Sequence, residues 1–133
     1  TVDAAGKVTV KGPGVAKITV KAAATTDYKA ASKTVTVTVA PKKQGISLVN
    51  KIKKQLTIKW KKNTKASGYQ VVYSTNKKFT GKKTVRKAKT TTSYKIKDLK
   101  KGKKYYVKVR SYKTVNGKRI YGAYSTAKKA TIK

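Results

Sequence analysis

The sequence predicts an all-β protein: an antiparallel β-sandwich, with part of a second β-sandwich at its N-terminus. Two observations carry this prediction. Short runs of β-branched and aromatic residues alternate with polar residues along the chain, and glycine, proline or asparagine stands between consecutive runs. Many short strands separated by regularly spaced turn residues are typical of sandwiches. No run shows apolar residues at helical spacing, so we expect no helix.

The composition changes near residue 41. Residues 1–40 carry six lysines, two aspartates and one aromatic residue, Tyr28, whereas the rest of the chain carries thirty Lys and Arg, one aspartate and all the other aromatic residues. Turn-forming residues mark the change, at Ala40-Pro41 and Gln44-Gly45. We therefore expect a first domain over residues 1–40, a linker over 41–45 and a second domain over 46–133.

Seven strands are predicted in the second domain: near 46–50, then 55–61, 68–74, 83–88, 92–97, 104–112 and 122–132. Alternation places one apolar set of side chains between two sheets and polar residues outside, as a half-solvated sheet requires. The predicted core comprises Leu56, Ile58, Trp60, Tyr69, Val71, Tyr73, Tyr94, Ile96, Leu99, Tyr105, Val107, Val109 and Ile132. Asn116-Gly117 favours a tight type I′ hairpin turn before the last strand.

Three patterns of the second domain together resemble a fibronectin type III domain. They are Leu56-x-Ile58-x-Trp60, Tyr69-x-Val71-x-Tyr73, and the run from Leu99 through Tyr105, Val107 and Val109 to Ser111. The resemblance, over residues 45–133, implies a seven-stranded sandwich. It also implies that the Tyr105 hydroxyl bonds back to the backbone near Leu99, as the family's tyrosine corner. The family often has proline where Lys101 stands, so this corner is expected to be less rigid.

Residues 1–40 resemble the C-terminal half of a group 2 bacterial immunoglobulin-like domain. The matching runs are Thr1-Val2-Asp3, Gly6-Lys7-Val8-Thr9, Gly14 to Val20, Tyr28 and Ser32 to Val39. The strands with which that domain begins are missing, and forty residues rarely bury enough surface to fold alone. Two interpretations stay open: the chain is a piece of a longer protein, or another chain supplies the missing strands by strand exchange.

Most catalytic and metal chemistry is excluded by composition. The chain has no His and no Cys, and its only carboxylates are the widely separated Asp3, Asp27 and Asp98. This excludes Ser/His/Asp and Cys/His catalysis, paired-carboxylate hydrolysis, calcium loops and nearly all zinc sites. We expect no enzyme activity and no cofactor. No apolar run is long enough to span a membrane, and the chain shows no signal peptide.

The formal net charge of +33 has two interpretations: a solvated, repulsive surface that keeps the module soluble, or a field that attracts anionic partners. Candidates are teichoic acids, other anionic polysaccharides and sulfated or sialylated host glycans. Arginine forks suit base and phosphate recognition better than lysine does, and the chain has only three Arg among its 36 basic residues. The sequence therefore favours diffuse attraction over specific nucleic-acid binding.

One face of the second domain is a candidate binding site. If the strands at 68–74, 104–112 and 122–132 share a sheet, alternation puts tyrosines, basic residues and an amide together on its outer face. This candidate face consists of Gln70, Val72, Tyr106, Lys108, Arg110 and Tyr112. Exposed tyrosines beside cations suit sugar stacking with anion contact. Ordinary cross-strand pairing is the alternative interpretation.

The lysine-rich runs, such as Lys101 to Tyr106, are similar to those of domains at the C-terminal end of large exported proteins of Gram-positive gut bacteria. The resemblance implies an extracellular or cell-wall location. We expect a non-catalytic structural or adhesion module of a cell-surface protein. The alternatives are a surface-filament subunit that self-associates through residues 1–40, and an accessory polysaccharide-binding module of a secreted enzyme.

Overall fold

The computed structural model describes residues 1–133 and contains strands but no helix, which confirms the all-β prediction. The ten strands are β1 (Gly14–Ala22), β2 (Ala31–Val39), β3 (Ile46–Val49), β4 (Leu56–Trp60), β5 (Gly68–Ser74), β6 (Lys83–Ala88), β7 (Ser93–Ile96), β8 (Lys104–Val115), β9 (Lys118–Tyr121) and β10 (Lys128–Thr131). No helix is present that is long and apolar enough to cross a membrane.

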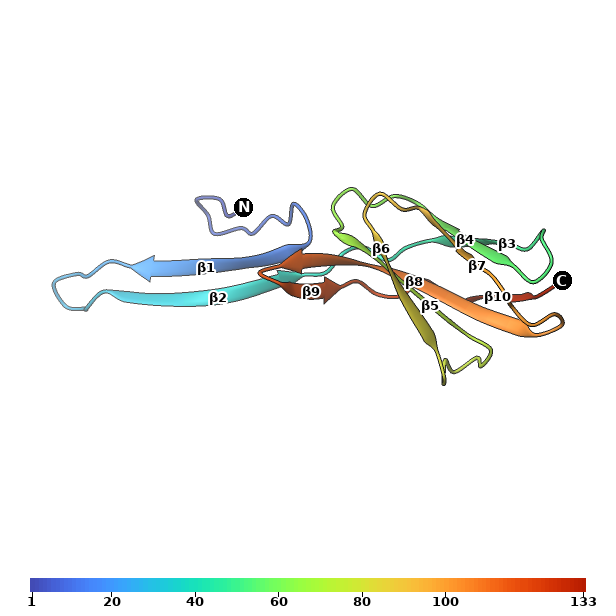
Figure 1. Ribbon diagram of the computed structural model, residues 1–133. Coiled ribbons are helices and arrows are strands. Elements are labelled where there is room, and N and C mark those ends of the chain that lie inside the picture. The colour runs from blue at the N-terminus through green and yellow to red at the C-terminus, as the bar shows by residue number, and fades with distance from the viewer.

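Strands β3 to β10 form the sandwich. One sheet has the order β3-β4-β7, and the other has the order β10-β8-β5-β6 (Figure 1). In addition, β9 pairs with the C-terminal end of β8. Every pairing is antiparallel. Ile58 faces Tyr94 across β4 and β7, and Val71 faces Val109 across β5 and β8. Both pairs hold predicted core residues, so the expected alternation sets the register of both sheets.

The core lies between these two sheets. It consists of Ile46, Leu56, Ile58, Trp60, Tyr69, Val71, Tyr73, Ile96, Leu99, Val107, Val109 and Ile132, with Tyr94 and Tyr105 packed against it and half-buried. The Trp60 and Tyr69 rings meet at 5.4 Å between centroids, tilted by 55°. The Tyr69 hydroxyl accepts a 2.6 Å hydrogen bond from the backbone N–H of Asn63, so this fully buried ring keeps its polar end satisfied.

The corner before β8 brings the Tyr105 hydroxyl to the backbone. This hydroxyl accepts a hydrogen bond from the N–H of Lys100 at 3.4 Å, a long distance for such a bond. Asp98 and Gly102 in the same corner adopt φ values of 55° and 74°. Leu99, which lies between these two residues in the chain, is buried in the core. The corner therefore has the expected connectivity, with a weak hydrogen bond.

The last predicted strand is wrong in one respect. We expected one strand over 122–132, but within that range the structure has only β10, and a separate strand, β9, precedes it and is joined to it by residues 122–127. Asn116 and Gly117 have φ values of 48° and 74°, which permits the tight turn that pairs Val115 with Lys118. β9 therefore starts directly after this turn and ends where the chain must cross to β10.

The N-terminal part is a long hairpin that joins neither sheet of the sandwich. β1 and β2 pair over nine residues each, from Gly14 opposite Val39 to Ala22 opposite Ala31. Figure 1 shows this hairpin extending away from the sandwich, with residues 1–13 folded back along it. Where we expected part of a second sandwich, the structure holds a single two-stranded sheet.

Residues 41–45, expected as a linker, are held against the sandwich. Pro41 and Gln44 are buried. The Gln44 amide donates hydrogen bonds to the Lys42 carbonyl and to the Ser111 hydroxyl, each at 3.3 Å. The Pro41 carbonyl lies so close to Gly122 that a Cβ there would collide with it. The hairpin is thus joined to the sandwich through a packed segment.

Candidate functional site

The candidate face predicted from sequence exists, but it is covered where we expected it to be open. Gln70 and Val72 are buried, and Tyr106 and Tyr112 are half-buried. β5 is buried along its whole length, on both faces. The expectation of an exposed outer face was therefore wrong for β5, because side chains from the β5–β6 loop and from residues 118–124 lie over it.

The covering side chains form a row in which rings and cations contact one another. This aromatic–cation row consists of Phe79, Lys108, Tyr124, Arg110, Tyr121, Tyr112 and Arg119. The Arg110 guanidinium lies 3.8 Å from the Tyr121 ring centroid and 4.3 Å from that of Tyr124. The Lys108 ammonium lies 4.1 Å from the Phe79 centroid and 4.4 Å from that of Tyr124.

Gln70 joins this row through hydrogen bonds. Its side-chain oxygen accepts a 2.6 Å bond from Arg110 Nε and a 3.1 Å bond from the Tyr124 hydroxyl. Burial lowers the pKa of Lys108 from its ordinary 10.5, and the like charges of Lys82 and Arg110 lower it further. The rings of the row already have the protein's own cations as partners. The row therefore tightens the sheet surface and leaves few free ring faces for a sugar to stack on.

A second site lies at the junction of the hairpin and the sandwich, which alternation within strands cannot reveal. A groove of about 540 Å³ runs between residues 10–13, residues 39–45 and the β4–β5 loop at 61–65. Six lysines line this lysine groove: Lys11, Lys42, Lys43, Lys61, Lys62 and Lys65. No carboxylate and no aromatic side chain is among its lining residues. Such a groove concentrates positive potential, because its low-dielectric walls focus the field.

Hydrogen bonds hold the walls of the lysine groove together. The Lys65 ammonium donates to the backbone carbonyl of Lys11, which ties the N-terminal segment to the β4–β5 loop. Asn63 shapes that loop, because its side-chain oxygen accepts from the N–H of Lys65 at 3.1 Å and its carbonyl accepts from the N–H of Ala66 at 3.1 Å. Gln44 anchors the opposite wall through Ser111.

The hairpin adds an apolar surface. One face of β1 and β2 carries Ala16, Ile18, Val20 and Ala22 opposite Val37, Val35, Lys33 and Ala31. The other face carries lysines, hydroxyl side chains and one apolar residue, Val15. Val20 and Val35 stay 65% and 48% exposed. Residues 1–13 shelter only the end nearest the sandwich, where Val2, Val8 and Val10 and the hairpin border a hollow of about 460 Å³.

Two parts of these sites were not predicted from the sequence. Tyr121 and Tyr124 were not singled out, although two tyrosines three residues apart after a turn are a detectable signal. The lysine groove draws on three segments that are far apart in sequence. The basic run at Lys59–Lys62 was visible in the sequence, but its approach to Lys11 and Lys43 depends on how the hairpin packs.

The comparisons agree with this architecture. The model of the fibronectin type III domain family matches residues 39–127. No curated protein matches the chain. The most informative solved structure is a segment of two fibronectin type III domains from chicken tenascin, with a TM-score of 0.63 and 18% identity, covering 89% of this chain and 63% of that one. The alignment thus extends beyond the sandwich into the hairpin.

Single fibronectin type III domains are also similar. That of the human collagen α-1(XX) chain has a TM-score of 0.54 at 15% identity, covering 67% of this chain and 82% of that one. The sixth such domain of the human fibronectin type III domain-containing protein 3 has a TM-score of 0.58 at 14% identity, covering 72% and 88%. These likenesses support the fold, and the match of the family model over residues 39–127 shows that the chain belongs to the fibronectin type III family.

Proposed function

We propose that this protein is a non-catalytic structural and adhesion module of an exported bacterial surface protein, which holds anionic polymers of the cell wall or of host surfaces by its positive charge. The supporting observation is the imbalance of 36 basic residues against three carboxylates. Almost all of these cations lack a carboxylate in the chain that could pair with them. A structural domain gains nothing in folding from such repulsion, so we attribute it to an external partner.

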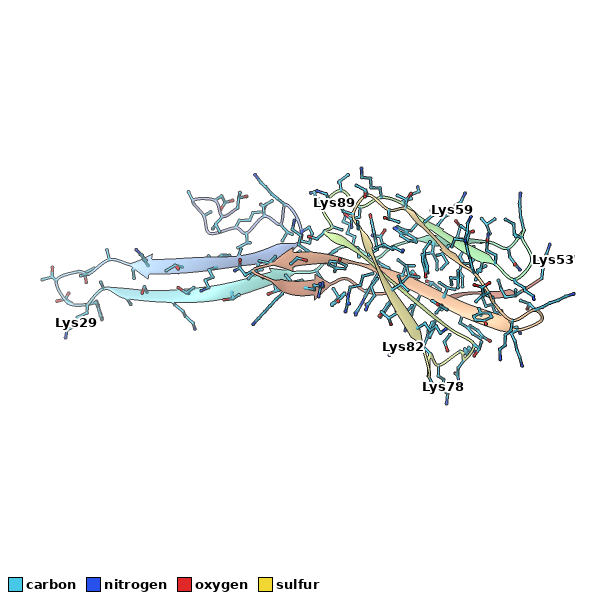
Figure 2. The ribbon with its side chains drawn as sticks, viewed as in Figure 1. Lys29, Lys53, Lys59, Lys78, Lys82 and Lys89 are labelled. Atoms are coloured by element: carbon cyan, nitrogen blue, oxygen red, sulfur yellow. The ribbon has the colours of Figure 1, made fainter.

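The lysines also point in many directions. Figure 2 shows Lys59 and Lys89 on one side of the sandwich, Lys78 and Lys82 on the opposite side, and Lys53 at the end far from the hairpin. Positive charge on all sides of the sandwich favours binding to an extended anionic polymer or to an anionic surface. The lysine-rich runs further support an extracellular or wall-associated location in a Gram-positive bacterium.

Binding to isolated Gram-positive cell walls tests this proposal. The full chain should sediment with intact walls at about 0.05 M NaCl and be released at about 0.5 M, because salt screens surface charges. Walls stripped chemically of their anionic polymers should retain much less protein. Failure to bind intact walls at low salt, or equal binding to stripped walls, would contradict the proposal.

The exposed apolar face of the hairpin supports a second candidate function, assembly through residues 1–40. We propose that these residues are the C-terminal part of a bacterial immunoglobulin-like domain whose remaining strands cover β1 and β2. Strands of a second copy would give a filament by exchange. Both outer edges of the hairpin also lack a paired strand, which makes them templates for strand addition.

Sedimentation analysis at about 0.5 M NaCl, where charge repulsion is screened, tests the assembly proposal. The chain should form larger species as its concentration rises, and Ile18→Lys should abolish them, since a charge would be placed on the apolar face. A matched Lys17→Gln variant changes only the polar face and should still assemble. A monomer at every concentration would rule out self-assembly. The apolar face of β1 and β2 would then have to be covered by strands of the same polypeptide.

A further inference from the structure

The lysine groove adjoins two smaller depressions, and the three form an extended basic track. At one end the groove shares Gly45 and Lys61 with a depression of about 380 Å³ that also contains Lys59. At the other end it shares residues 62–64 with a depression of about 180 Å³ that also contains Lys89. Figure 2 shows Lys59 and Lys89 on the same side of the sandwich. The shared lining residues make the track continuous, as binding of a linear polymer requires.

The walls of this track are fixed before any ligand arrives. Gln44 and Ser111 hold one wall, and the contact of Lys65 with the Lys11 carbonyl holds the other. Asn63 is half-buried and bonded through both its carbonyl oxygens and its backbone N–H. A prearranged site binds with a smaller loss of conformational entropy than loose surface lysines do.

The lining of the groove selects among anionic polymers. Binders of single-stranded nucleic acid combine a basic groove with aromatic rings on which bases stack, and sugar rings likewise stack on aromatic side chains. The groove lining has no aromatic residue and no arginine, and the one aromatic residue that lines the adjoining depressions, Trp60, is only 6% exposed. Lysine binds phosphate as a point charge and needs no planar partner. The groove therefore suits a chain of phosphates on flexible, non-planar spacers.

We infer that the lysine groove is a binding site for a linear phosphodiester polymer with polyol spacers. This inference rests on the proposed function, because it names the polymer class and the place of contact for the attraction proposed above. Lys43, Lys61 and Lys62 line the groove without taking part, through backbone or side chain, in the hydrogen bonds that hold its walls. Lys59 and Lys89 extend the contact at its two ends.

Two triple variants of equal charge test the inference, with poly(glycerol phosphate) as the probe in fluorescence titrations at several salt concentrations. The groove variant is Lys43→Gln, Lys61→Gln and Lys62→Gln. The control variant is Lys51→Gln, Lys53→Gln and Lys100→Gln, on exposed positions outside the groove and its adjoining depressions. Each variant removes three positive charges, so general attraction falls equally in both. Thermal unfolding of both verifies that they fold.

The groove variant should bind at least about tenfold more weakly than the parent, with the slope of log K against log salt smaller by about two, because three phosphate contacts are lost. The control should stay within about threefold of the parent with nearly the same slope. If both variants bind poly(glycerol phosphate) equally more weakly than the parent, the groove is not the binding site, while the proposed function stays intact. No binding by the parent at low salt would overturn both. Tighter parent binding to heparin than to poly(glycerol phosphate) would overturn the phosphate assignment.

Discussion

Gly68 occupies the point where β5, β6 and a tyrosine ring meet. A Cβ added there would lie 2.5 Å from the Tyr112 hydroxyl and 2.6 Å from the Lys87 carbonyl oxygen. Tyr112 could rotate away, but the carbonyl belongs to the paired strand and cannot move without opening the sheet. We expect Gly68→Ala to lower the free energy of unfolding by about 1–3 kcal/mol, measured by urea denaturation.

Gly45 is the matched control for that substitution. It lies in the segment that joins hairpin and sandwich, and a Cβ there would meet nothing within 4 Å. Gly45→Ala should therefore change the free energy of unfolding by less than about 1 kcal/mol. Equal losses in the two variants would show that the crowding at Gly68 is not what fixes glycine there.

Two tyrosine hydroxyls differ in what they contribute to stability. The Tyr69 hydroxyl is buried and accepts from Asn63 at 2.6 Å, whereas the Tyr105 hydroxyl accepts from Lys100 at 3.4 Å. Tyr69→Phe should cost about 1–2 kcal/mol, because it leaves a backbone N–H without its partner, and Tyr105→Phe should cost less than about 0.5 kcal/mol. Chemical denaturation of both variants in one buffer measures the difference. A larger loss for Tyr105→Phe would show that the corner bond is strong despite its length.

Lys108 should titrate below the ordinary pKa of a lysine side chain. Its pKa is lowered from 10.5 by burial first, then by Lys82 and Arg110. The unfolded chain keeps this proton to a higher pH than the folded chain does. The free energy of unfolding therefore rises with pH between the folded pKa and 10.5, and this gain is lost as the pH falls through the folded pKa. NMR titration of the lysine side chains measures this. Lys82→Gln should bring the pKa closer to 10.5 without restoring it, and titration of Lys108 at 10.5 or above in the parent would contradict the effect.

The hydrophobic core belongs to the sandwich, and the hairpin contributes no residue to it. Every residue of the core cluster lies between Ile46 and Ile132. A chain starting at Ala40 keeps the Pro41 and Gln44 contacts, so we expect its melting temperature to lie within about 4 °C of that of the full chain. A chain starting at Ile46 loses those contacts and should lose about 1–3 kcal/mol. Equal stability of the two truncated chains would show that the joining segment contributes nothing.

Strand positions were predictable from the sequence where alternation is regular and turn residues flank the strand on both sides. β5 and β6 were predicted to the residue, since alternation and flanking turn residues bound them on both sides. The split between β9 and β10 was not predictable, because it depends on the close approach of Gly122 to the Pro41 carbonyl. A contact between residues so distant in sequence leaves no local pattern.

The candidate face shows the same limit for side chains. Period-two alternation correctly placed Gln70 beside Lys108 and Arg110 on one side of the sheet, but it carries no information about what lies above them. Tyr121 and Tyr124 arrive from the segment after the turn, and Phe79 from a loop where its own φ is 60°. Loop conformations of this kind follow from tertiary packing, so the sequence could not show that the face is covered.

The molecule as a whole should be stabilised by salt. With a net charge of +33, repulsion among lysines opposes the compact state, and ions screen it over a Debye length that falls to about 3 Å at 1 M. We expect the melting temperature to rise by several degrees between about 0.01 M and 0.5 M NaCl, measured by differential scanning calorimetry. A melting temperature that falls with salt would mean that attractive charge pairs dominate instead.

The packed joining segment also determines how the protein would carry mechanical load. The hairpin leaves the sandwich at one end and the C-terminus lies at the other (Figure 1). Tension between the two would run along the strands and shear the β3–β4 and β8–β10 ladders, whose bonds then resist together. Pro41 against Gly122 and Gln44 against Ser111 would take up the pull before β3 does. Under the proposed function, tension would thus first load the joining segment at residues 41–45. This segment lines the lysine groove, where the anionic polymer is proposed to bind.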